Sequence, residues 1–300
     1  DNRIKMGEID NLFTTLLTIA DESTPGTNFM KKRALAALAN LTINSDNTIK
    51  MGKIPNLFKT LLDISTANKS TDTMKQKALD ALVNLSSNPA NKITIGQIKN
   101  IFPTLIKIFA DPENSKFTKE KALLLLVELT RHNVNREIMG DIPDVFNFLL
   151  ATTQVADELY ATHALNILLN LSIFSTKNQR AMGQTPGMFT TLLKFINEGT
   201  EKESSDVKTK YALGTLHHLV THPENQRPMG QTLNMMKTIL TIIIQQESGE
   251  GVLTTTAWNT LRELTLVSEN RKTSKLIPSI FSNLLKNFKK TAHLHIKNDV

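Results

Sequence analysis

The stretch "NLTINSDNTIKMGKIPNLFKTLL" at residues 40–62 decides the fold, because its pattern returns along the chain. It returns as "NLSSNPANKITIGQIKNIFPTLI" at residues 84–106 and as "NLSIFSTKNQRAMGQTPGMFTTLL" at residues 170–193. Each copy opens on an asparagine and a leucine, and a glycine precedes its second apolar run. A pattern that recurs at a nearly fixed interval indicates a repeated structural unit and not a single chemical site.

The interval between units identifies the class of repeat. Units aligned on an asparagine inside the pattern begin near residues 2, 47, 91, 135, 178, 225 and 270, at intervals of 45, 44, 44, 43, 47 and 45 residues. Five residues after each of the first six asparagines comes a glycine, at Gly7, Gly52, Gly96, Gly140, Gly183 and Gly230. A period of 40–47 residues is typical of helical solenoids. The sequence therefore predicts an all-α fold and a single repeat domain over residues 1–300.

Each unit is predicted to contain three helices. A short first helix, such as "NTIKM", ends at the glycine, which permits a left-handed stop and a close approach of two helices. A second helix begins near Ile54-Pro55 or Ile142-Pro143, with proline in the first turn. A third helix carries the pattern "ALAALANL" at residues 34–41 and its equivalents. On a helical wheel Asn40 lies opposite the apolar stripe, so we expect its side chain to point outward.

These units resemble the armadillo repeat, the type found in beta-catenin and importin-alpha. The resemblance covers the whole chain as six repeats plus an incomplete seventh, and implies a right-handed armadillo-type α-solenoid. It also implies that the third helices line a concave groove, in which the asparagine holds the backbone of an extended partner. Importin-alpha carries tryptophan four residues before that asparagine. The only tryptophan here, Trp258, is elsewhere, so recognition of a basic cargo signal is not expected.

Two columns of residues on the third helices form the candidate site. The asparagine column reads Asn40, Asn84, Glu128, Asn170, His218 and Glu263. The column seven residues earlier reads Arg33, Lys77, Lys121, His163, Tyr211 and Thr256. Three cations in successive units suit acidic groups, and an amide can pair with any peptide unit. We expect partner contacts from Arg33, Asn40, Lys77, Asn84, Lys121, His163 and Asn170.

Several function classes find no support in the sequence. There is no cysteine, which excludes disulfides, thiolate zinc sites and cysteine nucleophiles. We find no glycine-rich phosphate loop, nucleophile elbow or HExxH pattern. His218 and His222 stand four residues apart, but no carboxylate has a matching spacing. We expect a non-enzymatic protein without a cofactor or metal.

The charge distribution leaves two alternatives open. The net charge is +7, yet residues 270–300 hold seven basic side chains and one acid, so the rest is almost neutral. The first prediction is a scaffold that holds an extended, acidic segment of a partner. The alternatives are a regulator that grips a folded small GTPase, and binding of nucleic acid or anionic lipid through the basic C-terminal segment. No signal peptide or membrane-spanning run is visible, so we expect a cytoplasmic or nuclear protein.

Overall fold

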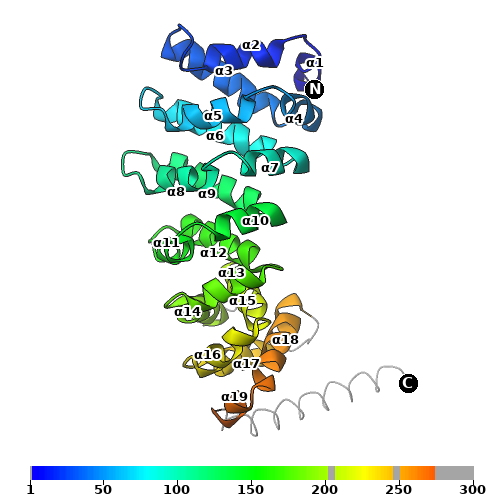
Figure 1. The fold of residues 1–300 in the computed structure, drawn as a ribbon, viewed down its shortest axis with the longest axis vertical. Coiled ribbons are helices and arrows are strands. Elements are labelled where there is room, and N and C mark those ends of the chain that lie inside the picture. The colour runs from blue at the N-terminus through cyan, green and yellow to red at the C-terminus, as the bar shows by residue number, and fades with distance from the viewer. Residues whose placement is uncertain (1, 202–206, 246–250, 274–300) are drawn as a thin grey trace, which may run out of the picture. The chain divides into compact units, whose positions relative to one another are not determined.

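The chain is all-α in the computed structural model, which describes residues 2–201, 207–245 and 251–273 (Figure 1). Those ranges contain nineteen helices and no strand, so the predicted fold class is confirmed. Two compact units emerge. The first consists of Asp1–Val145 with Ala151–Leu171, and the second of Phe146–Leu150 with Ser172–Val300. Most of the predicted incomplete seventh repeat, and most of the basic C-terminal segment, lie outside the described residues.

Three kinds of helix recur in the predicted order. The short first helices are α1 (Asn2–Met6), α4 (Ser45–Met51), α7 (Pro89–Gly96), α10 (Asn133–Gly140), α13 (Thr176–Gln184), α16 (Pro223–Gln231) and α19 (Ser268–Thr273). The second helices are α2 (Leu12–Ala20), α5 (Leu57–Thr66), α8 (Ile101–Ala110), α11 (Val145–Thr153), α14 (Met188–Glu201) and α17 (Met235–Gln245). The third helices are α3 (Asn28–Leu41), α6 (Asp72–Leu85), α9 (Lys116–Thr130), α12 (Glu158–Ser172), α15 (Val207–Val220) and α18 (Val252–Leu266).

The third helices begin at side-chain caps and bury one stripe. The hydroxyls of Thr27, Thr71 and Ser115 accept the backbone N–H three residues later, which satisfies a donor that has no partner inside the helix. In α3 the buried side chains include Ala34, Leu35, Leu38 and Leu41, which is the predicted apolar stripe. In the first compact unit, α3 packs on α6 and α6 packs on α9. These neighbouring repeats therefore share a core within the first compact unit.

The start of the second helices differs from the prediction. α5 begins at Leu57 and α11 at Val145, so Pro55 and Pro143 lie in the preceding turn and not in the first helical turn. The residue before each helix has left-handed backbone geometry, with φ of 61° at Asn56 and 59° at Asp144. Asparagine and aspartate tolerate this geometry better than other side chains do. Left-handed backbone geometry therefore occurs at the residue directly before the second helix.

The repeated glycine has a different role from the one predicted. Gly52 has φ of −60°, which is ordinary right-handed helical geometry, so the predicted left-handed stop is wrong. The predicted close approach is confirmed, because a Cβ atom at Gly52 would overlap the side chain of Asn91 in the next repeat. The same glycine–asparagine pair recurs inside both compact units, at Gly7–Asn47, Gly52–Asn91, Gly96–Asn135, Gly183–Asn225 and Gly230–Asn270.

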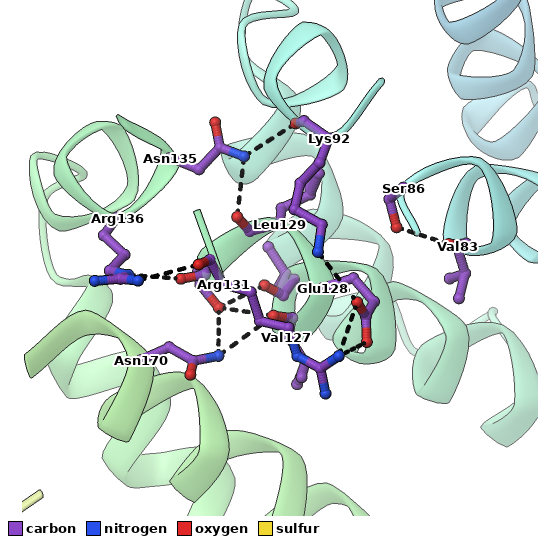
Figure 2. A network of polar contacts seen from close by, with 12 residues as sticks. Val83, Ser86, Lys92, Val127, Glu128, Leu129, Arg131, Asn135, Arg136 and Asn170 are labelled. Carbon is purple, nitrogen blue, oxygen red and sulfur yellow. Dashed lines mark hydrogen bonds and ion pairs between the residues drawn. The ribbon is translucent and has the colours of Figure 1, made fainter. Parts of the chain in front are cut away.

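The paired asparagines connect consecutive repeats by hydrogen bonds. Asn91 Nδ2 donates to Thr48 O at 3.0 Å in α4 and to Leu85 O at 3.2 Å at the end of α6. Figure 2 shows the equivalent Asn135, whose Nδ2 donates to Lys92 O and Leu129 O. One amide thus joins two carbonyls near the ends of separate helices, which also accept backbone N–H groups such as those of Gly52 and Asn88. Asn47, Asn225 and Asn270 make the same pair of bonds, so the asparagine is structural in these five repeats.

Candidate partner-binding surface

The candidate site lies on the third helices of the first compact unit. We call it the third-helix face and define it by the predicted residues Arg33, Asn40, Lys77, Asn84, Lys121, His163 and Asn170. They belong to α3, α6, α9 and α12, and each lies on a helix whose apolar stripe is buried in the core. The stacking of α3 on α6 and of α6 on α9 places equivalent positions beside one another.

The basic column is held by contacts within the chain. Lys77 Nζ lies 3.2 Å from Asp80 Oδ2, and Lys121 Nζ of the next third helix lies 3.0 Å from Asp80 Oδ1. Arg33 lies over the ring of Phe29, with its Cζ 5.1 Å from the ring centroid. The sequence did not reveal the role of Asp80. The Asp80 carboxylate therefore forms ion pairs with two of the three cations that were expected to meet an acidic partner.

The asparagine column is more engaged than the helical wheel predicted. Asn40 is exposed, as expected. Asn84 Nδ2 donates to Ala39 O at 3.2 Å and to Thr42 Oγ1 at 3.1 Å at the end of the preceding third helix. The outward orientation predicted for this column is therefore wrong for Asn84, because its NH₂ group is bound within the chain.

Asn170 makes the same inter-repeat contact and is buried. Its Nδ2 donates to Val127 O at 3.4 Å and to Thr130 Oγ1 at 3.2 Å (Figure 2). The outward prediction is wrong here as well. The signal for this contact was in the sequence, because a hydroxyl residue stands two positions after the column in the preceding repeat. A hydroxyl oxygen accepts what the amide donates.

Glu128 replaces the asparagine in the third repeat and uses different contacts. Its carboxylate lies 3.5 Å from Lys92 Nζ of α7 and 3.0 Å from Arg131 Nη1 (Figure 2). An ionised carboxylate accepts hydrogen bonds and cannot donate one. The hydroxyl at the end of the preceding third helix, Ser86, donates to Val83 O at 2.7 Å, as Thr42 donates to Ala39 O, but receives no hydrogen bond from Glu128. The third repeat thus has an ion pair within itself where the second and fourth repeats have an amide link to the preceding repeat.

His163 continues the basic column on α12 but differs electrostatically from the lysines. Burial lowers the pKa of its imidazole below the ordinary value, an effect opposed by the charges of Glu120 and Asp157. Histidine with a lowered pKa is neutral at pH 7. The permanent positive charge of the column therefore ends at Lys121.

Within residues 2–201, 207–245 and 251–273, no group of three or more His, Cys, Asp or Glu side chains is arranged to hold a metal ion. Of the two histidines four residues apart, His222 caps a helix, because its Nδ1 accepts the backbone N–H of Glu224 at the start of α16. Among the same residues no helix is both long and apolar enough to cross a membrane.

Comparison with solved structures identifies the architecture. A designed armadillo repeat protein matches with a TM-score of 0.69 over 84% of this chain and 99% of that chain, at 13% sequence identity. The chain has an armadillo-repeat fold. A second designed armadillo repeat protein, made for modular peptide recognition, matches with a TM-score of 0.67 and 13% identity over 84% of this chain and 98% of its own.

A natural protein shares the armadillo-type architecture. UNC-45 from Drosophila melanogaster matches with a TM-score of 0.67 and 16% identity over 90% of this chain and 33% of its own. No protein-family model and no curated protein matches the sequence. At such identities the similarity shows the fold alone.

Proposed function

We propose that this chain is a non-enzymatic protein-binding scaffold that holds an extended, acidic segment of a partner on the third-helix face. The observation that supports it most is the placement of basic side chains at one position of three successive third helices, on Arg33, Lys77 and Lys121. Cations repeated at the period of the fold favour a ligand that carries negative charge along its length. The designed armadillo protein made for modular peptide recognition supports the use of this fold for peptides.

The geometry of the fold gives the expected spacing of the ligand. Packed helices lie about 10 Å apart, and an extended chain advances roughly 3.3 Å per residue. Acidic residues about three positions apart would therefore meet successive cations. Asn40 adds an exposed amide, and the half-buried Asn84 would offer its Oδ1 as an acceptor, whereas Asn170 is buried. Each exposed ion pair is worth roughly 0.2–1 kcal/mol, so affinity must come from several repeats together.

A peptide selection with charge-reversed variants tests the proposal. Peptides are selected from a random-sequence display library on the immobilised chain, and their affinities are measured by fluorescence anisotropy. We expect acidic peptides whose binding is lost in the combined variant Arg33→Glu, Lys77→Glu and Lys121→Glu. The matched control reverses three exposed lysines away from this face, Lys53, Lys99 and Lys107. Unchanged affinity in the first variant would place the site elsewhere.

The two alternatives lead to other outcomes. A folded small GTPase would bind while no short peptide is recovered from the library. Binding through the basic C-terminal segment would appear as salt-sensitive retention on heparin or on vesicles containing anionic lipid. Replacing Lys275, Lys286, Lys289 and Lys290 by glutamine would then abolish retention, whereas the reversal on the third-helix face would not.

A further inference from the structure

A second column of side chains runs beside the basic column and is apolar. It occupies the position eleven residues before the asparagine column, in the first turn of each third helix. In the first compact unit Phe29 is 65% exposed, Phe117 is 62% exposed and Leu159 is 38% exposed. The second unit has exposed Val207 and Val252 at the same position. Among the six described third helices, α6 is the only one with a polar residue at this position, Thr73.

The apolar column is not needed to hold the helix ends together. In the first compact unit, polar contacts join the starts of neighbouring third helices. Asp72 Oδ1 accepts Thr118 Oγ1 at 2.6 Å and the backbone N–H of Ser115 at 3.3 Å, which joins the starts of α6 and α9. Lys116 Nζ lies 2.6 Å from Asp157 Oδ2, which joins the starts of α9 and α12. Phe117 lies between these anchored ends and remains exposed to solvent.

The apolar and basic columns occupy neighbouring positions on the third helices. They are four residues apart, which is about 6 Å along a helix, and they lie on the same side of it. The contact of Arg33 with the ring of Phe29 shows this adjacency directly. A ligand that meets the cations must therefore also pass the phenyl rings. Large exposed apolar side chains at one repeat position mark an interaction surface more often than single scattered ones do.

We infer that the segment bound on the third-helix face is amphipathic, with large apolar side chains as well as acidic ones. This inference rests on the proposed function and names the chemistry of its ligand. Phe29 and Phe117 are two repeats apart, roughly 20 Å, which corresponds to about six residues of extended chain. The expected ligand carries two large apolar residues about six positions apart, with acidic residues between them.

Two other occupants fit the surface less well. A purely acidic segment would pair with Arg33, Lys77 and Lys121 but would leave the rings of Phe29 and Phe117 in water. A second copy of this chain could cover the rings, yet it would bring the same three cations against each other, and like charges across an interface oppose association. An acidic segment with apolar residues satisfies both columns at once.

The test extends the peptide selection with variants of the apolar column. We expect the recovered peptides to combine acidic and large apolar residues, and to bind the double variant Phe29→Ser, Phe117→Ser about tenfold or more weakly, as for aromatic anchors in other interfaces. Serine replacements of the apolar peptide residues should weaken binding similarly. Phe174→Ser is the matched control, because Phe174 is 94% exposed and lies outside the third-helix face. Thermal melts of each variant check that the fold is retained.

The outcomes separate this inference from the proposed function. Acidic peptides without apolar residues, bound equally by the double variant, would overturn the inference and leave the proposed function standing. Peptides insensitive to reversal of Arg33, Lys77 and Lys121, or no recovered peptide, would overturn both. Self-association in sedimentation experiments that is abolished by the double variant would identify a second copy as the occupant and would also overturn the inference.

Discussion

The side chain of Asn91 fills the space that a Cβ atom of Gly52 would occupy. The two residues come from consecutive repeats, and the amide of Asn91 donates to Thr48 O in the same short helix that Gly52 follows. Glycine is therefore required for contact with a neighbour and not for backbone freedom. The pair recurs in both compact units. Since a Cβ atom would overlap the asparagine, the glycine permits this close approach of one short helix to the next.

Replacing this glycine should destabilise the chain even when the new residue is alanine. Gly52 has helical geometry, in which a change to alanine alone would stabilise by roughly 0.4–1 kcal/mol. The overlap with Asn91 reverses the sign, and we expect Gly52→Ala to lower the free energy of unfolding by about 1–3 kcal/mol. Gly26→Ala is the control, since a Cβ atom there has no neighbour within 4 Å. Urea denaturation of both variants measures the difference.

The double variant Gly52→Ala, Asn91→Ala distinguishes overlap from other causes. Removing the amide relieves the overlap, although Thr48 O and Leu85 O then each lose one of their two donors. The two changes should therefore be non-additive, with a combined loss smaller than the sum of the single losses. Additive losses would contradict the assignment of the contact.

The asparagines of the third helices should differ in their structural contribution. Asn84 makes two hydrogen bonds to the preceding repeat, whereas Asn40 is exposed on α3. We expect Asn84→Ala to cost about 1 kcal/mol in unfolding free energy, the usual net value of such bonds. Asn40→Ala should stay within about 0.5 kcal/mol. Equal losses in chemical denaturation would argue against a stabilising role of the Asn84 amide.

Much of the fold could be predicted because the repeat places equivalent residues at a fixed interval. The period, the three helices of each unit and the buried stripe of α3 all follow from apolar spacing. The role of Gly52 was only half predicted. Glycine is compatible with both a left-handed stop and a close contact, and the partner that decides between them lies 39 positions later, at Asn91.

The candidate site was harder to predict because contacts between repeats do not appear in a helical wheel. A wheel places Asn84 opposite the stripe within α6, but it says nothing of Thr42 at the end of α3. It shows Lys77 beside Asp80, three residues apart on α6, but it does not show Lys121 of the next repeat. Such polar pairs depend on the distance between neighbouring helices, which a single repeat does not encode.

Removing the internal carboxylate should strengthen binding of acidic peptides. Asp80 forms ion pairs with Lys77 and Lys121 and so competes with any ligand carboxylate for the same cations. Asp80→Asn keeps the size of the side chain and removes its charge, so we expect peptides that depend on Lys77 and Lys121 to bind roughly two- to tenfold more tightly. Anisotropy titrations at low and high salt provide the measurement. Weaker binding would show that Asp80 orients the lysines for the ligand.

The free energy of unfolding should decrease as the pH is lowered, because two half-buried histidines become protonated. Burial lowers the pKa of His163 and, in the second unit, of His217. Between each lowered pKa and the ordinary value of about 6.5, the unfolded chain binds more protons than the folded one. The free energy of unfolding therefore decreases as pH falls below about 6.5, and the slope vanishes below the folded pKa. Urea denaturation between pH 7.5 and 4.5 follows this loss. We expect His163→Gln to flatten part of the slope and His163→Gln with His217→Gln to flatten more of it, and a slope unchanged in the double variant would assign the loss to other groups.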